Sequence, residues 1–273
     1  MTSTQPTKSK DITISKDKTI SFILTINQST SKVEYQKIVK DAAKHVEIKG
    51  FRKGKAPLDL AEKELSPNKI YDQIIQNVLP KKYEQIIKEN KLNPVIRPQI
   101  ILKNPPLSLD KDWQFEITIC QKPELKLSAF ETELKTLNKQ GYTDTQDQNR
   151  KILDLIIKKA KVTIPKVLLD TQIRDRITQL IDSASQAGMT LKQFLDSKDT
   201  TIEKYQQSLS ENFTREWIIS LSLDKIAEDK KIVIDPKEVQ KNLDPNDQTE
   251  YQYNLSHYIL KQQKTLDLLR QIK

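Results

Sequence analysis

Apolar side chains alternate with other residues along four short stretches in the first half of the chain. The clearest are residues 20–26 and 113–120, where every second side chain is apolar, and residues 11–15 and 95–102 carry weaker versions of the pattern. Alternation of this kind is typical of strands that bury one face. Pro98 interrupts the fourth stretch, and a proline inside a strand favours an edge position. The first half therefore predicts a small sheet.

Helix-spaced apolar positions lie between these strands. A capping-box sequence at Ser31 to Glu34 predicts the start of one helix, which ends near Gly50. A short helix is expected over 57–65, and a longer one from Ser66 onward, bent by Pro80. The predicted order is two strands, a helix, a loop, two helices and two strands. This order describes an antiparallel sheet packed on helices.

The second half of the chain shows helical spacing almost throughout. Its apolar stripes predict helices in the ranges 152–160, 165–188, 190–195, 202–226 and 251–272, and Asp235-Pro236 is expected to start a further short helix. Gly188 is expected to end the second of these helices, because glycine tolerates the left-handed conformation of a helix cap. The predicted fold class is α+β: a small domain of antiparallel sheet plus helices, then an elongated all-α domain.

Composition narrows the class of protein. The chain has 273 residues, 30% of them charged, and only four glycines, which suits a helix-rich globular protein. No apolar run is long enough to span a membrane, and residues 1–10 are polar, so a disordered tail is expected there and not a signal peptide. A single cysteine, Cys120, excludes an internal disulfide. We therefore expect a cytoplasmic protein.

The net charge of +9 is concentrated in the first half. Residues 1–127 carry 23 Lys and Arg against 15 Asp and Glu, whereas the remainder of the chain is nearly neutral. Uneven charge of this kind indicates that the first half faces a polyanion. A simple effect on solubility is the alternative. A basic domain followed by a neutral domain is better explained by an anchor that faces nucleic acid than by an effect on solubility.

The most distinctive stretch is the loop Gly50 to Pro57. It contains Gly50, Phe51, Arg52, Lys53, Gly54 and Lys55, so two of the four glycines flank an aromatic side chain and cations. Glycines permit a tight turn, and Pro57 suits the first turn of the next helix. The stretch predicts an exposed loop between two helices that presents Phe51 and its neighbouring cations. A solvated basic turn, with Phe51 folded back onto its own helices, is the plainer interpretation.

The motif Gly-Phe-Arg-Lys-Gly-Lys-x-Pro resembles the ribosome-docking signature of bacterial trigger factor, a chaperone family. The stretches 78–83 and 92–95 also resemble family sequence, so the likeness covers most of 11–127. The resemblance implies a ribosome-binding domain whose helical hairpin carries the loop. It further implies contact with protein and rRNA of the large ribosomal subunit at the exit tunnel.

In typical family members an isomerase domain of the FK506-binding type follows the ribosome-binding domain. Only 26 residues lie between Pro123 and Arg150, and such a domain needs on the order of 100 residues. We therefore expect no isomerase domain and no enzymatic activity. The expected organisation is a tail at 1–10, a ribosome-binding domain at 11–127, a linker at 128–149 and a helical domain at 150–273.

Residues 150–176 resemble the start of the family's carboxy-terminal domain. The resemblance implies helical arms around a crevice that holds nascent and unfolded chains. Candidate client contacts at the ends of the arms are Met189, Phe194, Tyr251, Tyr253 and Tyr258. The same apolar stripes also fit the sealed core of a helix bundle. Sequence does not separate these two roles, nor does it decide whether the chain self-associates.

Motifs for other chemistry are missing from the sequence. His45 and His257 stand in no metal-ligand spacing, and the glycine-rich sequences that bind nucleotides are not present. Gly50 to Lys55 is too short for a phosphate-binding loop. No metal or cofactor is therefore expected, and a chaperone of this kind would work without ATP.

The leading hypothesis is a ribosome-associated chaperone that lacks the isomerase domain. The main rival is a ribosome-assembly or RNA-binding factor without client binding, which the basic first half permits. A periplasmic chaperone related through the helical half and a residual isomerase are two further alternatives. Neither a signal sequence nor an isomerase-sized segment supports them.

Overall fold

The computed structural model describes residues 12–45, 51–52, 57–243 and 249–272. The chain divides into two compact units, Met1–Lys122 and Pro123–Lys273. Each unit has its own hydrophobic core.

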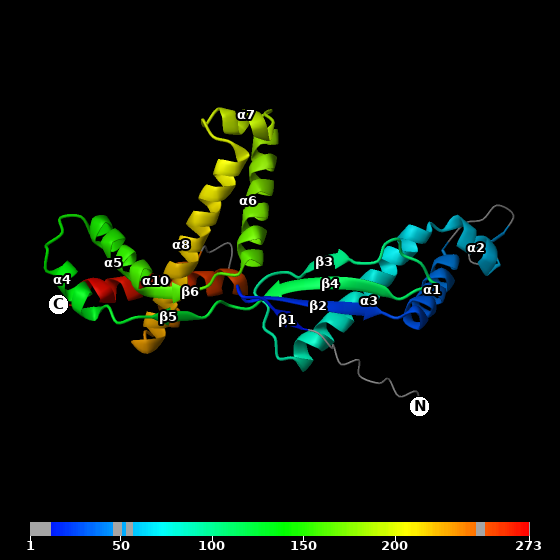
Figure 1. Cartoon of the computed structure of the whole chain (residues 1–273), viewed down its shortest axis with the longest axis horizontal. Coiled ribbons are helices and arrows are strands. Elements are labelled where there is room, and N and C mark those ends of the chain that lie inside the picture. Colours follow the sequence, from blue (N-terminus) through cyan, green and yellow to red (C-terminus); the bar gives the residue numbers. More distant parts are fainter. Residues whose placement is uncertain (1–11, 46–50, 53–56, 244–248, 273) are drawn as a thin grey trace. The chain divides into compact units, whose positions relative to one another are not determined.

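The first unit contains strands and helices in the predicted order (Figure 1). Its elements are β1 (Thr13–Ile14), β2 (Thr19–Ile26), α1 (Gln28–Ala43), α2 (Leu58–Glu64), α3 (Pro67–Glu89), β3 (Gln99–Leu102) and β4 (Trp113–Cys120). The strand order is β1-β2-β4-β3, and the paired strands are antiparallel. The strand that follows Pro98 is an edge strand, as predicted.

Alternation decides which face of this sheet is buried. Ile20, Phe22, Leu24 and Ile26 of β2 stand opposite Ile119, Ile117, Phe115 and Trp113 of β4. All eight side chains are buried, and they form one cluster with apolar residues of α1 and α3. The helices therefore cover one face of the sheet, and their apolar stripes supply the other half of the core.

Helix α1 begins earlier than its local sequence predicts. The capping box expected at Ser31 is wrong, because Ser31 is buried inside the helix and its hydroxyl donates to the carbonyl of Gln28 at 2.9 Å. The backbone N–H of Gln28 donates to Oδ1 of Asp112 at 2.7 Å. A carboxylate that accepts from the first turn stabilises a helix start. Asp112, distant in sequence, therefore supplies the cap that the expected box does not.

The second unit is mainly helical. Its elements are β5 (Leu125–Leu127), α4 (Glu131–Asn138), α5 (Thr145–Lys159), β6 (Ala160–Val162), α6 (Lys166–Gln186), α7 (Leu191–Asp196), α8 (Ile202–Asp229), α9 (Pro236–Lys241) and α10 (Glu250–Gln271). Helices α6, α7 and α8 form a hairpin, and α8 also packs against α5 and α10 (Figure 1). Gly188 follows α6 with a φ of 70°, which is the left-handed geometry expected there.

Two features of the second unit differ from the sequence expectation. Strands β5 and β6 pair antiparallel, so a short ribbon accompanies the helices of the expected all-α half. Residues 128–149, expected as a linker, contain α4 and the start of α5. Phe130 and Leu134 are buried in one cluster with Leu269 of α10. This segment therefore belongs to the core of the second unit, because it supplies apolar side chains that α10 needs.

Asn138 joins this segment to the end of α10. Its side-chain amide donates to the carbonyls of Leu269 and Ile272, each at 2.8 Å. We expect Asn138→Ala to destabilise the second unit by about 1–2 kcal/mol, because two carbonyls lose their donor. Urea unfolding followed by the fluorescence of Trp217 in a Trp113→Phe background measures this change. Thr136→Ala on the same helix is the control, and equal midpoints for the two variants would contradict the expectation.

Candidate functional site

The loop at 50–57 joins α1 to α2, as the sequence predicts. Phe51 is 44% exposed and Arg52 is exposed, whereas Gly50, Lys53, Gly54 and Lys55 lie outside the described residues. Phe51 places a large aromatic side chain beside the guanidinium-bearing Arg52, and aromatic and arginine side chains are the types enriched at protein interfaces. The plainer interpretation, in which Phe51 folds back onto its own helices, would leave less of this side chain exposed than the 44% observed. Phe51 and Arg52 are therefore available to a partner.

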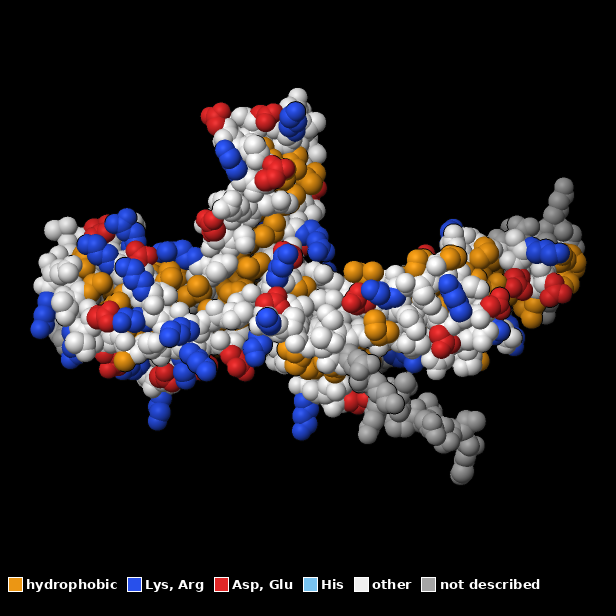
Figure 2. Space-filling view, in the orientation of Figure 1, with side chains coloured by type: hydrophobic (Ala, Val, Ile, Leu, Met, Phe, Trp, Pro, Cys, Tyr) orange, Lys and Arg blue, Asp and Glu red, His pale blue; other side chains and the backbone are white. Residues whose placement is uncertain are grey.

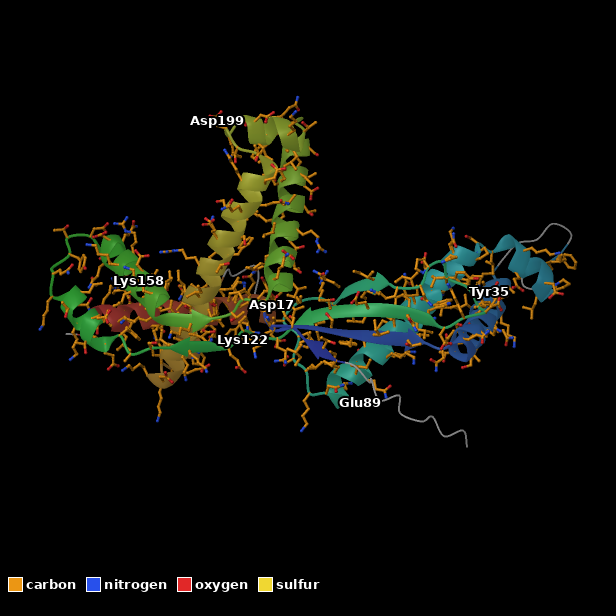
Figure 3. All side chains as sticks on the ribbon, in the orientation of Figure 1. Asp17, Tyr35, Glu89, Lys122, Lys158 and Asp199 are labelled. Carbon is orange, nitrogen blue, oxygen red and sulfur yellow. The ribbon has the colours of Figure 1, made fainter. Side chains whose placement is uncertain are left out.

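A hydrogen bond between side chains braces the two helices that carry the loop. The phenol of Tyr35 on α1 donates to Oε1 of Glu62 on α2 at 2.7 Å (Figure 3 labels Tyr35). Partial burial, then the hydrogen bond and the charge of Glu62, raises the pKa of Tyr35 to about 12. The bond joins α1 to α2, the two helices that flank the loop in the chain.

Alkaline pH should weaken this brace. The folded pKa of Tyr35 lies above its ordinary value of 10.0, so its stabilising contribution is complete below pH 10 and is lost as pH rises towards 12. At pH 8 we expect Tyr35→Phe to destabilise the first unit by about 0.5–1 kcal/mol, since one hydrogen bond is lost. The deficit relative to wild type should shrink between pH 10 and 12.

The measurement is urea unfolding of the first unit, followed by Trp113 fluorescence in a Trp217→Phe background. Glu62→Gln is the matched control, because its amide oxygen still accepts from Tyr35 while the carboxylate charge is removed. It should retain most of the stability at pH 8. A Tyr35→Phe variant as stable as wild type at that pH would contradict the role of the brace.

Aromatic contacts connect the brace to the sheet. The rings of Tyr35 and Tyr71 lie 6.4 Å apart, and Tyr71 meets Trp113 edge-on at 5.4 Å. Trp113 is buried, and its Nε1 donates to the carbonyl of Ser108 at 2.7 Å. Edge-on aromatic pairs hold side chains in defined orientations. These contacts connect α1, through Tyr71 of α3, to the buried Trp113 of the sheet.

The five client-contact candidates of the second unit have different environments. Tyr251 is 72% exposed and Tyr258 is also exposed, whereas Met189, Phe194 and Tyr253 are half-buried. The hydroxyl groups of Tyr258 and Ser220 are 2.6 Å apart, which joins α10 to α8. Phe194 lies under the ammonium group of Lys198, 4.8 Å from the ring centre. The structure therefore leaves Tyr251 and Tyr258 most open to a partner.

Tyr251 and Tyr258 belong to a longer apolar stripe on α10. Leu255 and Ile259 are exposed as well, and the four positions follow the spacing that places side chains on one helix face. The sequence indicated Leu255 and Ile259 only as part of a helical pattern. Single exposed apolar side chains are normal on a protein surface, whereas four of them on one helix face form a contiguous patch of the kind that marks an interaction site.

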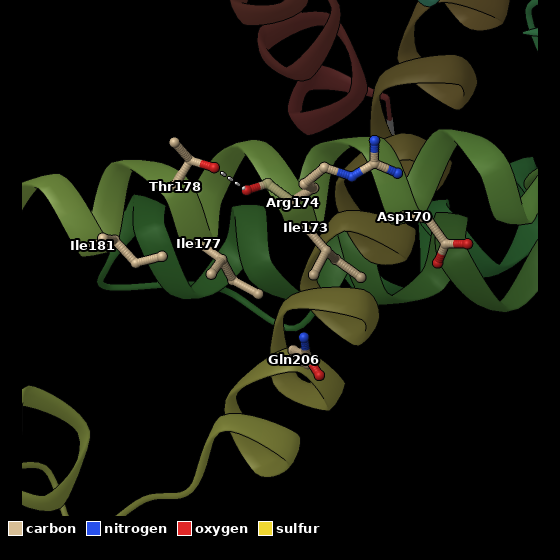
Figure 4. A pocket seen from close by; sticks show the side chains of 7 residues that line it. All are labelled: Asp170, Ile173, Arg174, Ile177, Thr178, Ile181 and Gln206. Carbon is tan, nitrogen blue, oxygen red and sulfur yellow. Dashed lines mark hydrogen bonds between the residues drawn. The ribbon is translucent and has the colours of Figure 1, made fainter. Parts of the chain in front are cut away.

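A hollow between α6 and α8 contains a second apolar stripe. Three isoleucines, Ile173, Ile177 and Ile181, lie side by side on α6 and point the same way (Figure 4). Ile181 is 43% exposed, and the other two are half-buried. The remaining lining residues are Asp170, Arg174, Thr178 and Gln206. Figure 2 shows hydrophobic side chains at the surface of this hairpin.

The three isoleucines were predicted as part of a helical stripe but not as a binding surface. Core and crevice residues share the same spacing, so the sequence held no signal that separates them. The hollow offers an apolar surface, and its rim carries one negative and one positive side chain, Asp170 and Arg174. Apolar side chains of a partner would lose contact with water at such a surface.

The residues that the structure describes give no support for a metal site, a membrane span or a reactive thiol. No group of three or more potential metal-ligating side chains occurs among them. None of their helices has the length and apolar character needed to cross a membrane. Burial, together with the charge of Asp17, raises the pKa of the Cys120 thiol to about 11, which keeps it protonated.

Two family models match the chain, and together they cover nearly all of it. The model for bacterial trigger factor protein matches residues 9–154, and the model for the trigger factor carboxy-terminus matches residues 129–272. The two matches overlap, so no residues lie between them. The matched family models are thus those of the amino-terminal and carboxy-terminal domains.

Similar proteins of known name are trigger factors. One from Streptococcus pneumoniae (strain Hungary19A-6) is 28% identical over 143 residues, which cover 50% of this chain and 33% of that protein. One from Staphylococcus epidermidis (strain ATCC 35984) is 30% identical over 110 residues, which cover 40% of this chain and 25% of that protein. The chain thus spans about a third or less of the length of these relatives.

A solved structure has a similar fold. It comes from work on promiscuous substrate recognition in the folding and assembly activities of the trigger factor chaperone. The TM-score is 0.62 at 11% sequence identity, and the match covers 96% of this chain and 99% of the solved chain. At this identity the likeness concerns the fold alone.

Proposed function

The chain belongs to the bacterial trigger factor family, and on that premise we propose that it is an ATP-independent chaperone of the cytoplasm. It docks on the large ribosomal subunit near the exit tunnel through the loop at 50–57. Its second unit holds nascent or unfolded chains while they fold. The observation that carries this proposal is an exposed Phe51 beside Arg52 on a braced helical hairpin.

Docking uses two kinds of contact at the loop. Phe51 inserts into an apolar pocket on the ribosome, as buried aromatic anchors commonly do at interfaces. Arg52, Lys53 and Lys55 contact rRNA phosphates or acidic protein side chains. The basic first half of the chain supports this assignment, because it attracts a polyanion before contact is made.

The two apolar stripes of the second unit hold the client chain. The isoleucines of α6 and the exposed stripe on α10 bind apolar client segments, each at roughly 25 cal/mol per Å² of apolar area removed from water. Helix α8 packs against both α6 and α10, so both stripes belong to one compact unit. Met189, Phe194 and Tyr253 remain proposed contacts at the edges of this surface.

We propose no isomerase activity for this chain. The two family matches overlap and leave no segment of the size that an isomerase domain requires. An assay of prolyl isomerisation in a short peptide should give the uncatalysed rate. Catalysis above that rate would overturn this part of the proposal.

Two measurements on the intact chain separate the chaperone from its main rival. The chaperone pellets with ribosomes and also suppresses the aggregation of a chemically denatured enzyme. A ribosome-assembly or RNA-binding factor pellets with ribosomes but leaves aggregation unchanged. The exposed apolar stripes of the second unit favour the chaperone, because RNA binding would leave them without a role.

A further inference from the structure

Helices α1 and α2, which flank the loop at 50–57, form the docking hairpin of the proposed function. A hollow lies on these two helices, outside the loop itself. It is formed by one face of α1 and the first residue of α2, and its lining includes Val33, Lys37, Lys40, Lys44 and Leu58. The positions on α1 are four, three and four residues apart, so these side chains share one helix face. This face is separate from the buried face of α1, which carries Ile38 and Val39.

The hollow combines exposed apolar side chains with positive charge. Val33 is 63% exposed and Leu58 is 43% exposed. Three lysines surround them, against one carboxylate, Asp41, in the lining. Contact with water is unfavourable for the apolar side chains of Val33 and Leu58. Helix propensity does not explain the valine either, because valine is a weak helix former. The hollow therefore has the composition of a contact surface.

The lysines of the hollow are only partly neutralised. Lys44 lies 2.8 Å from Asp41, and Lys37 lies 3.8 Å from Glu34. The hydrogen bond and charge of Lys44 lower the pKa of Asp41, with a smaller contribution from Lys37. Among the described residues no carboxylate forms an ion pair with Lys40. The hollow thus retains net positive charge that a partner's carboxylates would complement.

We propose that this hollow is a second contact of the docking hairpin and takes an apolar side chain flanked by carboxylates, from a protein at the docking surface. The inference rests on the proposed docking function and extends it beyond the loop. Helix α1 precedes that loop in the chain and α2 follows it, so the hollow lies on the two helices that flank the loop. An acidic protein segment matches both the apolar and the cationic parts of the hollow.

RNA matches only one of those parts. Phosphates would satisfy the lysines, but bases bind proteins chiefly by stacking on aromatic side chains or on arginine. The lining residues of the hollow include neither an aromatic side chain nor an arginine. Val33 and Leu58 would therefore stay exposed against RNA and become buried against a protein.

A charge-reversal pair tests the affinity. We expect Lys37→Glu/Lys40→Glu in the full chain to bind purified large ribosomal subunits about tenfold more weakly, because attraction to carboxylates becomes repulsion. The control is Lys81→Glu/Lys88→Glu on α3, which changes net charge equally. Lys88 lies 3.7 Å from Glu84, as Lys37 lies near Glu34, and Lys81 resembles Lys40 in its exposure. Equal affinities for the two pairs would overturn the proposal.

Cross-linking tests the chemistry of the partner without changing the lysines. A benzoylphenylalanine at Gln36, which lines the hollow, should form an adduct with a ribosomal protein in the docked complex. An adduct with rRNA, or none at all, would overturn the proposal. If the Lys37→Glu/Lys40→Glu chain docks as tightly as wild type, while docking is still lost when Phe51 is changed, this inference is rejected and the proposed function stays intact.

Discussion

Ribosomes should no longer pellet a chain in which Phe51, Arg52 and Lys53 are all changed to alanine. Truncation of a central aromatic anchor costs roughly 2 kcal/mol or more, and two charge-assisted contacts are lost with it. We therefore expect at least about a 100-fold loss of affinity for the large subunit. Phe51 is exposed, so its removal should leave the unfolding midpoint of the first unit unchanged.

The control for this variant removes two cations elsewhere in the first unit. Lys81→Ala/Arg97→Ala changes the net charge as much as the Arg52 and Lys53 substitutions do, and both residues are exposed. It should pellet like wild type. Binding of the wild-type chain should also weaken as salt rises, because exposed charges are screened. Undiminished pelleting of the triple variant would contradict the docking role of the loop.

Client holding should depend on the isoleucine stripe of α6. We expect Ile173→Gln/Ile177→Gln/Ile181→Gln to bind an unfolded client about 10–100-fold more weakly, because three partly exposed apolar side chains are lost. Glutamine preserves helix propensity, so α6 should remain folded. Binding to a fluorescently labelled, permanently unfolded protein measures the effect, and ribosome pelleting should stay normal.

Two substitutions on the opposite face of the same helix provide the control. Asp175→Gln/Asp182→Gln changes exposed positions that do not line the hollow. Client affinity should change by less than about twofold, since exposed surface charges contribute little. A triple isoleucine variant that binds clients as well as this control would show that the hollow is not a client site.

The proposed docking loop was singled out from sequence because its signals are local. Glycines, cations and an aromatic side chain occur within eight positions, and the structure confirms that Phe51 is exposed between two helices. Strand β4 could be predicted in the same way, because apolar side chains alternate with polar ones from Trp113 to Ile119 and the alternation identifies the buried face. Patterns that depend on near neighbours are the ones a sequence reveals.

Features that depend on distant residues were missed. Asp112 caps α1 across 84 positions, which moves the start of that helix ahead of the local capping box. Leu134 is buried by contact with α10, so a short segment expected as a linker belongs to a core. Strands β5 and β6 have three residues each, too few for a recognisable alternation.

The proposed client surface is the part of the candidate site that the sequence described least well. Ile173, Ile177 and Ile181 follow the same helical spacing as buried core residues, and only the packing of α8 decides which remain open. Phe194 was a candidate client contact at the end of an arm, and it is half-buried. Exposure is a property of the packed unit and not of the stripe.

The central claim is that one chain docks through its loop and holds a client in its second unit. A photoreactive residue at Gln206, in the hollow beside the isoleucines, tests it on ribosomes stalled with an apolar nascent segment outside the tunnel. We predict an adduct with the nascent chain that disappears when Phe51, Arg52 and Lys53 are changed to alanine. No adduct with the wild-type loop, or an equal yield with the altered loop, would contradict the account.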